Sequence, residues 1–316
     1  LRRVRYEQLV DSSKPSDSFR AQARRWIEAA GEASELGREK SLFYAVSAWI
    51  PEPSLGDLNT DVSHAVLTRE GNSMTLLRAV LNEAGIKNDL YFVRSPYAAP
   101  EKLPTREAGN FNTPILRVDI GGEGHWLSPS GPDAMFGAVE QQNFGQELMC
   151  VTCKSDKDGI ARLPTTGYPE NTERVEIKAD VDDKGDLAGT LRVILKGAAA
   201  QPLRAGLRAR ADDANREKLM GAIAAQLVTG CTVASYEIIN EKAPDTTLEL
   251  VMKITRPAFA RPNAGGMGIE TRLFDEPIAR VFASLPERTV PMMIGYARQG
   301  EQYMELSFPR KPKVLS

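Results

Sequence analysis

The chain has 316 residues, 42% of them hydrophobic, and a formal net charge of −2 at pH 7. That length allows two domains, each with its own core. Lys and Arg are dispersed and form no stripe with aromatic residues, so nucleic-acid binding is not expected, and no apolar run is long enough for a transmembrane segment.

Helices are predicted for the first third of the chain. Residues 16–18 (SDS) give an N-cap signal ahead of an amphipathic stretch, and a second amphipathic stretch, 38–50, stops at Pro51. Within 74–84 apolar residues recur at helical spacing and Gly85 follows. This pattern predicts a buried helix whose N-terminus begins at Ser73.

An antiparallel sheet is expected to follow these helices. Residues 89–93 and 112–118 have strand composition, and the three glycines within 119–124 predict a hairpin turn. Helices followed by an antiparallel sheet indicate an α+β fold for this part of the chain.

The pattern changes after residue 153. Residues 154–159 form a charged linker, and alternation in 175–179 and 191–195 on either side of the turn 182–186 predicts a β-hairpin. A helix is predicted at 204–227, and further strands at 232–240, 248–255, 290–295 and 302–308. We therefore expect two domains, 1–153 and 154–316, the second a mostly β, sandwich-like domain with one inserted helix.

Three motifs in the first domain resemble those of a known family. Residues 71–86 read GNSMTLLRAVLNEAGI, 111–118 read FNTPILRV and 126–130 read WLSPS. In the same order, bacterial transglutaminase-like proteins, a branch of the papain-like thiol superfamily, have G-x-C-x-x-x-x-L-L-x-x-L-L-x-x-A-G-I, F-N-H-x-I-V-R-V and W-L-D-P-T. The resemblance covers roughly residues 35–150 and implies a transglutaminase-like, papain-like core of helices and antiparallel sheet. Residues 154–316 resemble, more loosely, the β domain that follows such cores.

The resemblance places the catalytic Cys, His and Asp of the family on Ser73, Thr113 and Ser128. A serine at a helix N-terminus needs a general base, which Thr113 cannot be. His125 lies three residues before Ser128, so the two point to opposite faces of one strand, and His64 lies in a short predicted helix; we expect structural roles for both. We expect a pseudoenzyme with no cofactor and no metal. The alternative is a serine-based hydrolase or acyltransferase that uses Ser73 with an unidentified base.

The chain has three cysteines, two of them in a C-x-x-C motif. Cys150 and Cys153 have the spacing of a redox or zinc half-site, but a second ligand pair is missing. We interpret them as small buried residues or as a local disulfide, and the spacing leaves both open.

The expected function is that of a binding or scaffold module in a larger exported bacterial protein. Small hydroxyl residues leave a neutral cleft that suits an uncharged polar or peptide ligand, with Asn112 and Trp126 as candidate ligand-binding residues at its border. The partner is expected to be a peptide, a protein or a cell-envelope ligand. The chain begins LRRVR, neither an initiator Met nor a signal peptide, so we expect a fragment of a periplasmic or extracellular protein.

Overall fold

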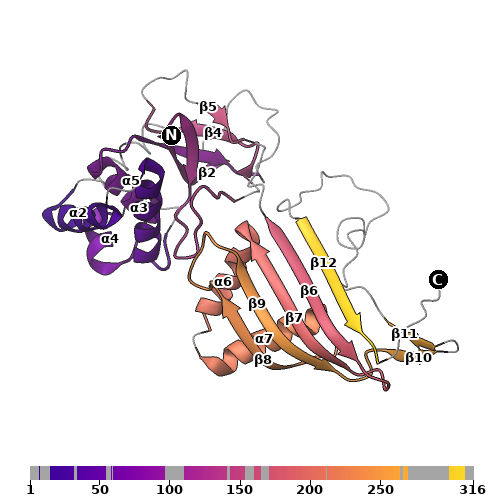
Figure 1. Cartoon of the computed structure of the whole chain (residues 1–316). Helices are drawn as coiled ribbons and strands as arrows, with labels where there is room; N and C mark the ends of the chain where they lie inside the picture. Colours follow the sequence, from indigo (N-terminus) through magenta and orange to yellow (C-terminus); the bar gives the residue numbers. More distant parts are fainter. Residues whose placement is uncertain are drawn as a thin grey trace. The chain divides into compact units, whose positions relative to one another are not determined.

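The computed structural model is an α+β protein that divides into two compact units, Leu1–Pro169 and Glu170–Ser316 (Figure 1). The residues that it describes are 7, 15–31, 34–54, 58, 60–96, 110–140, 143–153, 160–164, 171–210, 212–263, 266–269 and 299–309.

Four described helices form one layer of the first unit: α2 (Asp17–Ala30), α3 (Glu35–Trp49), α4 (Val62–Thr68) and α5 (Ser73–Glu83). Each begins after a side chain that accepts a hydrogen bond from a backbone N–H of its first turn, as N-caps do; these residues are Ser16, Ser34, Asp61 and Asn72. The predicted helix at 74–84 therefore exists, and Ser73 is its first residue.

The first sheet has the strand order β3-β2-β1-β4-β5, and all neighbours are antiparallel. The strands are β1 (Asn88–Arg94), β2 (Phe111–Ile120), β3 (Glu123–Leu127), β4 (Glu147–Cys150) and β5 (Ile160–Arg162). Because β5 pairs with β4, the first unit extends beyond the boundary expected at residue 153 and reaches Pro169.

The two faces of this sheet have different surroundings. On one face Leu90, Phe92, Leu116 and Val118 belong to the core that the helices fill. On the other, Tyr91, Val93, Ile115, Leu148 and Cys150 form a smaller apolar cluster. Alternating residues of β1 thus serve two separate cores, which is why the run Leu90 to Val93 is apolar without alternation.

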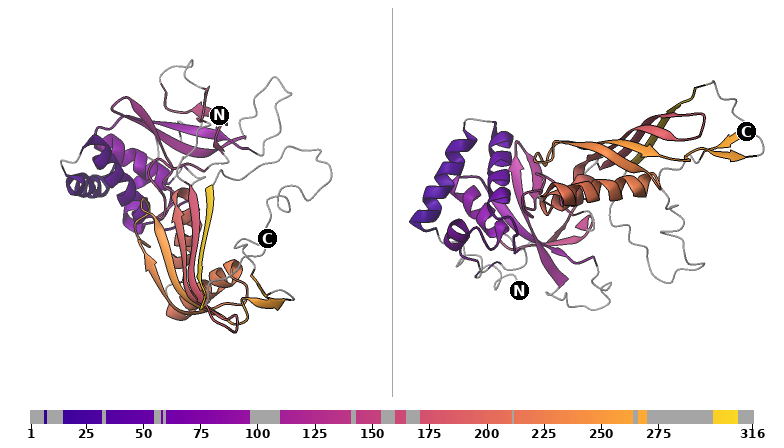
Figure 2. Two further views of the ribbon diagram at one scale, coloured as in Figure 1. Left: turned by 45° about the vertical axis from the view of Figure 1, so that its right-hand side comes forward. Right: turned by 90° about the horizontal axis from the view of Figure 1, so that it is seen from below.

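The second unit is a five-stranded sheet with the order β12-β6-β7-β9-β8. Its strands are β6 (Thr172–Val181), β7 (Leu187–Lys196), β8 (Thr232–Ile239), β9 (Leu248–Arg256) and β12 (Gln299–Ser307). Only the β12–β6 pair is parallel. The helices α6 (Gln201–Arg208) and α7 (Asp213–Leu227), preceded by the 3-10 turn η4 (Gly197–Ala200), pack on one face (Figure 2). The strands β10 (Arg261–Asn263) and β11 (Gly266–Gly268) pair antiparallel as a separate two-stranded sheet.

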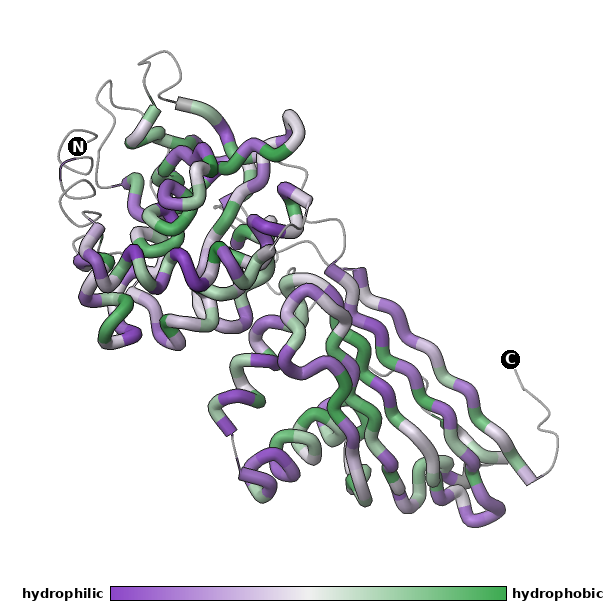
Figure 3. The backbone as a smooth tube through the Cα atoms, turned by 60° about the vertical axis from the view of Figure 1, so that its left-hand side comes forward, coloured by the Kyte–Doolittle hydropathy of each residue, from purple (hydrophilic) through white to green (hydrophobic). Residues whose placement is uncertain are grey.

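The expected sandwich with one inserted helix differs from this arrangement. In the described part of the unit one five-stranded sheet carries helices on one face, and hydrophobic and hydrophilic residues alternate along its strands (Figure 3). The opposite face bears ion pairs: Arg192 contacts Glu176 at 3.0 Å and Glu249 at 2.7 Å. A charged face does not need a second sheet to cover it. The strand expected at 290–295 lies outside the described residues.

The single helix expected at 204–227 is two helices. α6 ends at Arg208, and α7 starts anew behind Asp212, whose carboxylate accepts the backbone N–H of Asn215 at 2.9 Å. This backbone hydrogen bond and a second from the Asn215 side chain lower the pKa of Asp212. A capped helix start interrupts an otherwise helical pattern, because the capping residue is not helical itself.

Candidate functional site

The site begins at the N-terminus of α5. The Asn72 side chain caps the helix by accepting the Thr75 N–H at 2.8 Å, and its amide donates to the Ser54 carbonyl at 2.6 Å. Ser73 is fully buried, and its hydroxyl donates a hydrogen bond to the carbonyl oxygen of Pro129. Three segments therefore meet here: the loop between α3 and α4, the start of α5 and the segment after β3.

Ser128 lies in that segment, one residue before the Pro129 acceptor. It is half-buried, and its carbonyl accepts the Ser130 N–H at 2.9 Å, which forms a tight turn after β3. The structure therefore brings Ser73 next to the segment that contains Ser128.

Thr113 has a different environment. In β2 it pairs with Val93, whose side chain lies in the small cluster on the face away from the helices. Directly paired residues of antiparallel strands share a face. The register thus places Thr113 on the face opposite α5, where its hydroxyl donates to Asn112 Oδ1 at 3.3 Å.

The two candidate ligand-binding residues lie at different places in the sheet. Asn112 is exposed, at the irregularity where the β1–β2 register shifts between Val93 and Arg94. Trp126 packs edge-on against Tyr91, with ring centroids 5.2 Å apart, on the face away from the helices. Trp126 is therefore mainly a packing residue of the smaller cluster.

Among the described residues, neither histidine has a contact that indicates catalysis. His64 is exposed on α4. His125 pairs with Val118, so it lies on the helix-facing side, where its ring packs 5.7 Å from that of Phe136. The expectation that His125 and Ser128 point to opposite faces of one strand is wrong, because β3 ends at Leu127 and Ser128 lies beyond it.

A buried carboxyl group on α3 was not expected. Glu39 is fully buried, and neither of its carboxylate oxygens has a hydrogen-bond partner among the described residues. Burial, with a smaller contribution from Glu35, raises its pKa from 4.5 to about 7. A sequence signal existed, because Glu39 lies in line with the apolar residues Leu42, Phe43 and Val46 of the same helix.

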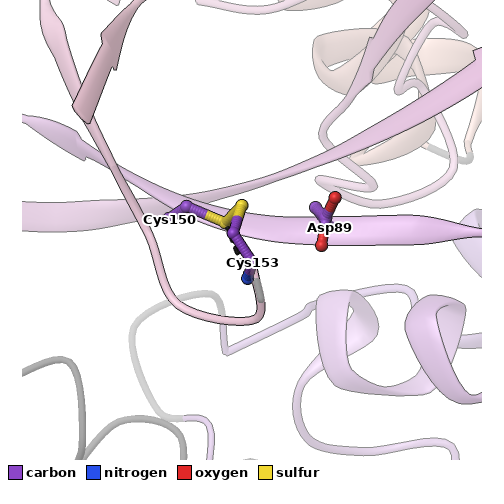
Figure 4. A group of neighbouring side chains, drawn as sticks. All are labelled: Asp89, Cys150 and Cys153. Carbon is purple, nitrogen blue, oxygen red and sulfur yellow. Dashed lines mark hydrogen bonds between the residues drawn. A yellow bond between two sulfur atoms is a disulfide. The ribbon is translucent and has the colours of Figure 1, made fainter. Parts of the chain in front are cut away.

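The C-x-x-C motif lies at the end of β4 and contains a disulfide between Cys150 and Cys153. The Asp89 side chain of β1 lies beside it (Figure 4). One possible ligand atom from each of these three residues lies within 4.8 Å of the other two. Among the described residues this is the group that could hold a metal ion.

Tyr91 completes this neighbourhood. Its hydroxyl lies 3.5 Å from Cys153 Sγ. Burial raises the pKa of Tyr91, and the nearby charge of Asp89 raises it further, against a hydrogen bond from Arg117 that lowers it. The hydroxyl therefore stays protonated well above neutral pH and can act as a donor.

Comparison with known proteins leaves the family open. No family model matches the chain, and no curated protein matches it. A distant structural neighbour is a crystal structure from Parabacteroides distasonis described as a "putative protease", with 12% identity and a TM-score of 0.40. The match covers 80% of this chain and 52% of that one, so the chain spans about half the length of its neighbour. At this TM-score the likeness assigns no family.

The architecture alone therefore defines the class of the protein: it is an α+β protein of two units. Within the part of the chain that the structure describes, every helix is too short or too polar to cross a membrane.

Proposed function

We propose that the first unit is a catalytically inactive transglutaminase-like module. The observation that carries this proposal is the hydrogen bond of Ser73. At the position where the family has its nucleophile, the hydroxyl is buried and donates to the Pro129 carbonyl. A carbonyl oxygen is not a base that could accept the proton of an attacking serine, so this hydroxyl acts as a structural donor.

Ser128, next to the Pro129 acceptor, supports the same proposal by its place, whereas Thr113 lies on the sheet face opposite α5 and supports it by its residue type alone. Thr113 and Ser128 carry hydroxyl groups, which neither accept a proton at neutral pH nor orient an imidazole as a carboxylate does. The members of a triad act as a unit, so the loss of all three leaves no thiol mechanism to support turnover.

The role that remains is binding or scaffolding within a larger exported bacterial protein, with a peptide, protein or cell-envelope ligand as partner. Export is supported by the Cys150–Cys153 disulfide, since disulfides persist in oxidising compartments outside the cytoplasm.

The test uses a serine-directed acylating probe on the full chain. We expect no labelling of wild type beyond that of the Ser73→Ala variant, and no hydrolysis of peptide, amide or ester substrates. Labelling that depends on Ser73 would show an active serine and replace this proposal by a serine-based hydrolase or acyltransferase.

A further inference from the structure

The C-x-x-C loop is held against β1 by contacts on both of its sides. Cys150 pairs with Tyr91 across the β1–β4 ladder, and the Val151 N–H donates to the Leu90 carbonyl at 2.8 Å. Cys150 is fully buried, whereas Cys153 and Asp89 are half-buried. The loop therefore has a fixed position and one side open to solvent.

The loop also orients the Asp89 carboxylate. The hydroxyl of Thr152, between the two cysteines, donates to Asp89 Oδ1 at 3.0 Å and accepts the Leu90 N–H at 2.9 Å. In metal centres, hydrogen bonds of this kind hold the ligating carboxylate in the orientation that coordination requires. The residue that positions Asp89 is thus part of the motif that supplies the two sulfur atoms.

Two hydrogen-bond donors lie next to the sulfur atoms. The Cys153 backbone N–H donates to Cys150 Sγ at 3.1 Å, and the Tyr91 hydroxyl lies 3.5 Å from Cys153 Sγ. Both groups are donors, and hydrogen bonds to an ionised acceptor are stronger than those to a neutral one. These contacts stabilise a pair of thiolates better than they stabilise a disulfide.

We propose that, in its dithiol form, the chain binds one thiophilic divalent cation, such as zinc, through Cys150, Cys153 and Asp89. Two thiolates select a soft or borderline cation, and a carboxylate oxygen is a usual third ligand for zinc. A water molecule or an outside ligand takes the fourth tetrahedral position.

Reduction must precede binding, and a dithiol reductant supplies the electrons. Its thiolate attacks Cys153 Sγ, the more exposed sulfur, and the S–S bond of the protein breaks to give a mixed disulfide. The second thiolate of the reductant then displaces Cys153 and leaves as an oxidised cyclic disulfide. The protein gains two electrons and two protons, and the cation then displaces the two thiol protons.

The backbone spacing suits both forms. The Cα atoms of Cys150 and Cys153 are 5.7 Å apart. Two sulfur atoms on one tetrahedral zinc, each at ~2.3 Å, are about 3.7 Å from each other. Rotation about the Cα–Cβ bonds reaches that separation without moving the strands. Disulfide and metal exclude each other, so the redox state of the surroundings decides which form exists.

The test titrates the full chain with Cd²⁺ alone after reduction with a phosphine under argon. We expect one Cd²⁺ per chain, with the ultraviolet charge-transfer band of cadmium thiolates, and competition by Zn²⁺. The oxidised chain is expected to show no such band. Cys150→Ser and Cys153→Ser are each expected to lose the band in large part.

Variants of the oxygen ligand separate the proposed site from simple chelation by two thiols. Asp89→Asn and Thr152→Val are each expected to weaken Cd²⁺ binding about 10-fold or more, whereas Asp89→Cys is expected to strengthen it. Cys231→Ser and Asp119→Asn are the matched controls, and they should leave the affinity unchanged. Circular dichroism of each reduced variant establishes that it is folded.

Two results would overturn the proposal. One is a reduced chain that binds Cd²⁺ no better than the oxidised chain does. The other is an Asp89→Asn variant, folded and reduced, with wild-type affinity, since Asp89 would then not be a ligand.

Discussion

The buried hydroxyl of Ser73 donates to the carbonyl of Pro129 and so joins the first turn of α5 to the segment after β3. The two residues are 56 positions apart in the chain. The contact makes the Ser73 side chain part of the connection between the helical layer and the sheet. Its contribution to folding can be measured separately from any catalytic role.

Ser73→Ala is expected to destabilise the first unit by about 1–3 kcal/mol, because it leaves the buried Pro129 carbonyl without this donor. All three tryptophans, at 26, 49 and 126, belong to the first unit. Urea unfolding followed by tryptophan fluorescence therefore reports on this unit alone. The control is Ser41→Ala, which removes an exposed hydroxyl that donates to Gly37 O at 2.9 Å within α3; its effect should stay below about 0.5 kcal/mol. Equal unfolding midpoints for the two variants would contradict the structural role of Ser73.

Ser73→Cys alone is expected to give no transglutaminase, peptidase or amidase turnover. The helix N-terminus would lower the pKa of a thiol at position 73 and favour its thiolate. Position 113 holds a threonine, so this variant has no imidazole there to transfer a proton to the leaving amine. General acid–base catalysis is worth about 10²-fold to 10⁴-fold in rate.

The triple variant Ser73→Cys, Thr113→His, Ser128→Asp tests the placement of position 113. We expect it to remain inactive, because the β1–β2 register places residue 113 on the sheet face away from α5. Peptidase or amidase assays on the refolded variant provide the measurement. Turnover would mean that an imidazole at 113 reaches the start of α5, and that the register described here is not the functional one.

Glu39 is expected to make the stability of the first unit pH-dependent. Its pKa is about 7 in the folded chain, against 4.5 as the ordinary value. The folded state therefore binds more protons than the unfolded state between these values, so its contribution to stability is complete below pH ~4.5 and is lost as pH rises through about 7. The loss is on the order of 3 kcal/mol.

Urea unfolding at a series of pH values, compared between wild type and Glu39→Gln, measures this contribution. Glu39→Gln should lack this contribution. The difference in the free energy of unfolding between wild type and variant should therefore change between pH ~4.5 and ~7 and be constant above pH ~7. Glu28→Gln, which changes an exposed carboxylate on α2, is the control. Parallel curves for wild type and Glu39→Gln would be evidence against a protonated, buried Glu39.

Two glycines of the second unit are expected to respond to alanine in opposite directions. A Cβ on Gly189 in β7 would lie 2.3 Å from the Lys178 carbonyl oxygen and 2.4 Å from Ala179 Cα, which are backbone atoms of the paired strand β6. Gly189→Ala should therefore separate the two strands and destabilise the unit by several kcal/mol. On Gly221 in α7 a Cβ meets nothing within 4 Å. Gly221→Ala should stabilise by up to about 1 kcal/mol. Thermal unfolding followed by circular dichroism distinguishes the two, and a stable Gly189→Ala variant would contradict the β6–β7 register.

Local patterns were sufficient to predict the elements whose signals lie within one segment. The helix that starts at Ser73 follows from apolar spacing and the stop at Gly85, and the hairpin of β6 and β7 follows from alternation on either side of a polar turn. Capping at Asp212 is equally local, but the apolar residues on both sides of it continue the helical pattern and hide the break.

Features that depend on pairing between distant segments could not be predicted in this way. The face on which Thr113 lies is decided by its pairing with Val93 and by the irregularity at Asn112, neither of which has a local signature. The burial of Glu39 depends on helices packed against α3 from elsewhere in the chain. The disulfide of Cys150 and Cys153, by contrast, is local, but spacing alone fits a bonded pair and a reduced pair equally well.

The parallel pairing of β12 with β6 also determines when the second unit can be completed during synthesis. Gln299 pairs with Thr172 and Ser307 with Asp180, so β6 acquires its second neighbour only after more than a hundred further residues have been translated. Until then, on the ribosome, the backbone groups along one side of β6 are unsatisfied and open to pairing with other nascent chains. In the complete sheet β12 takes over the edge position, and a chain cleaved or terminated before residue 299 lacks the strand that covers this side of β6.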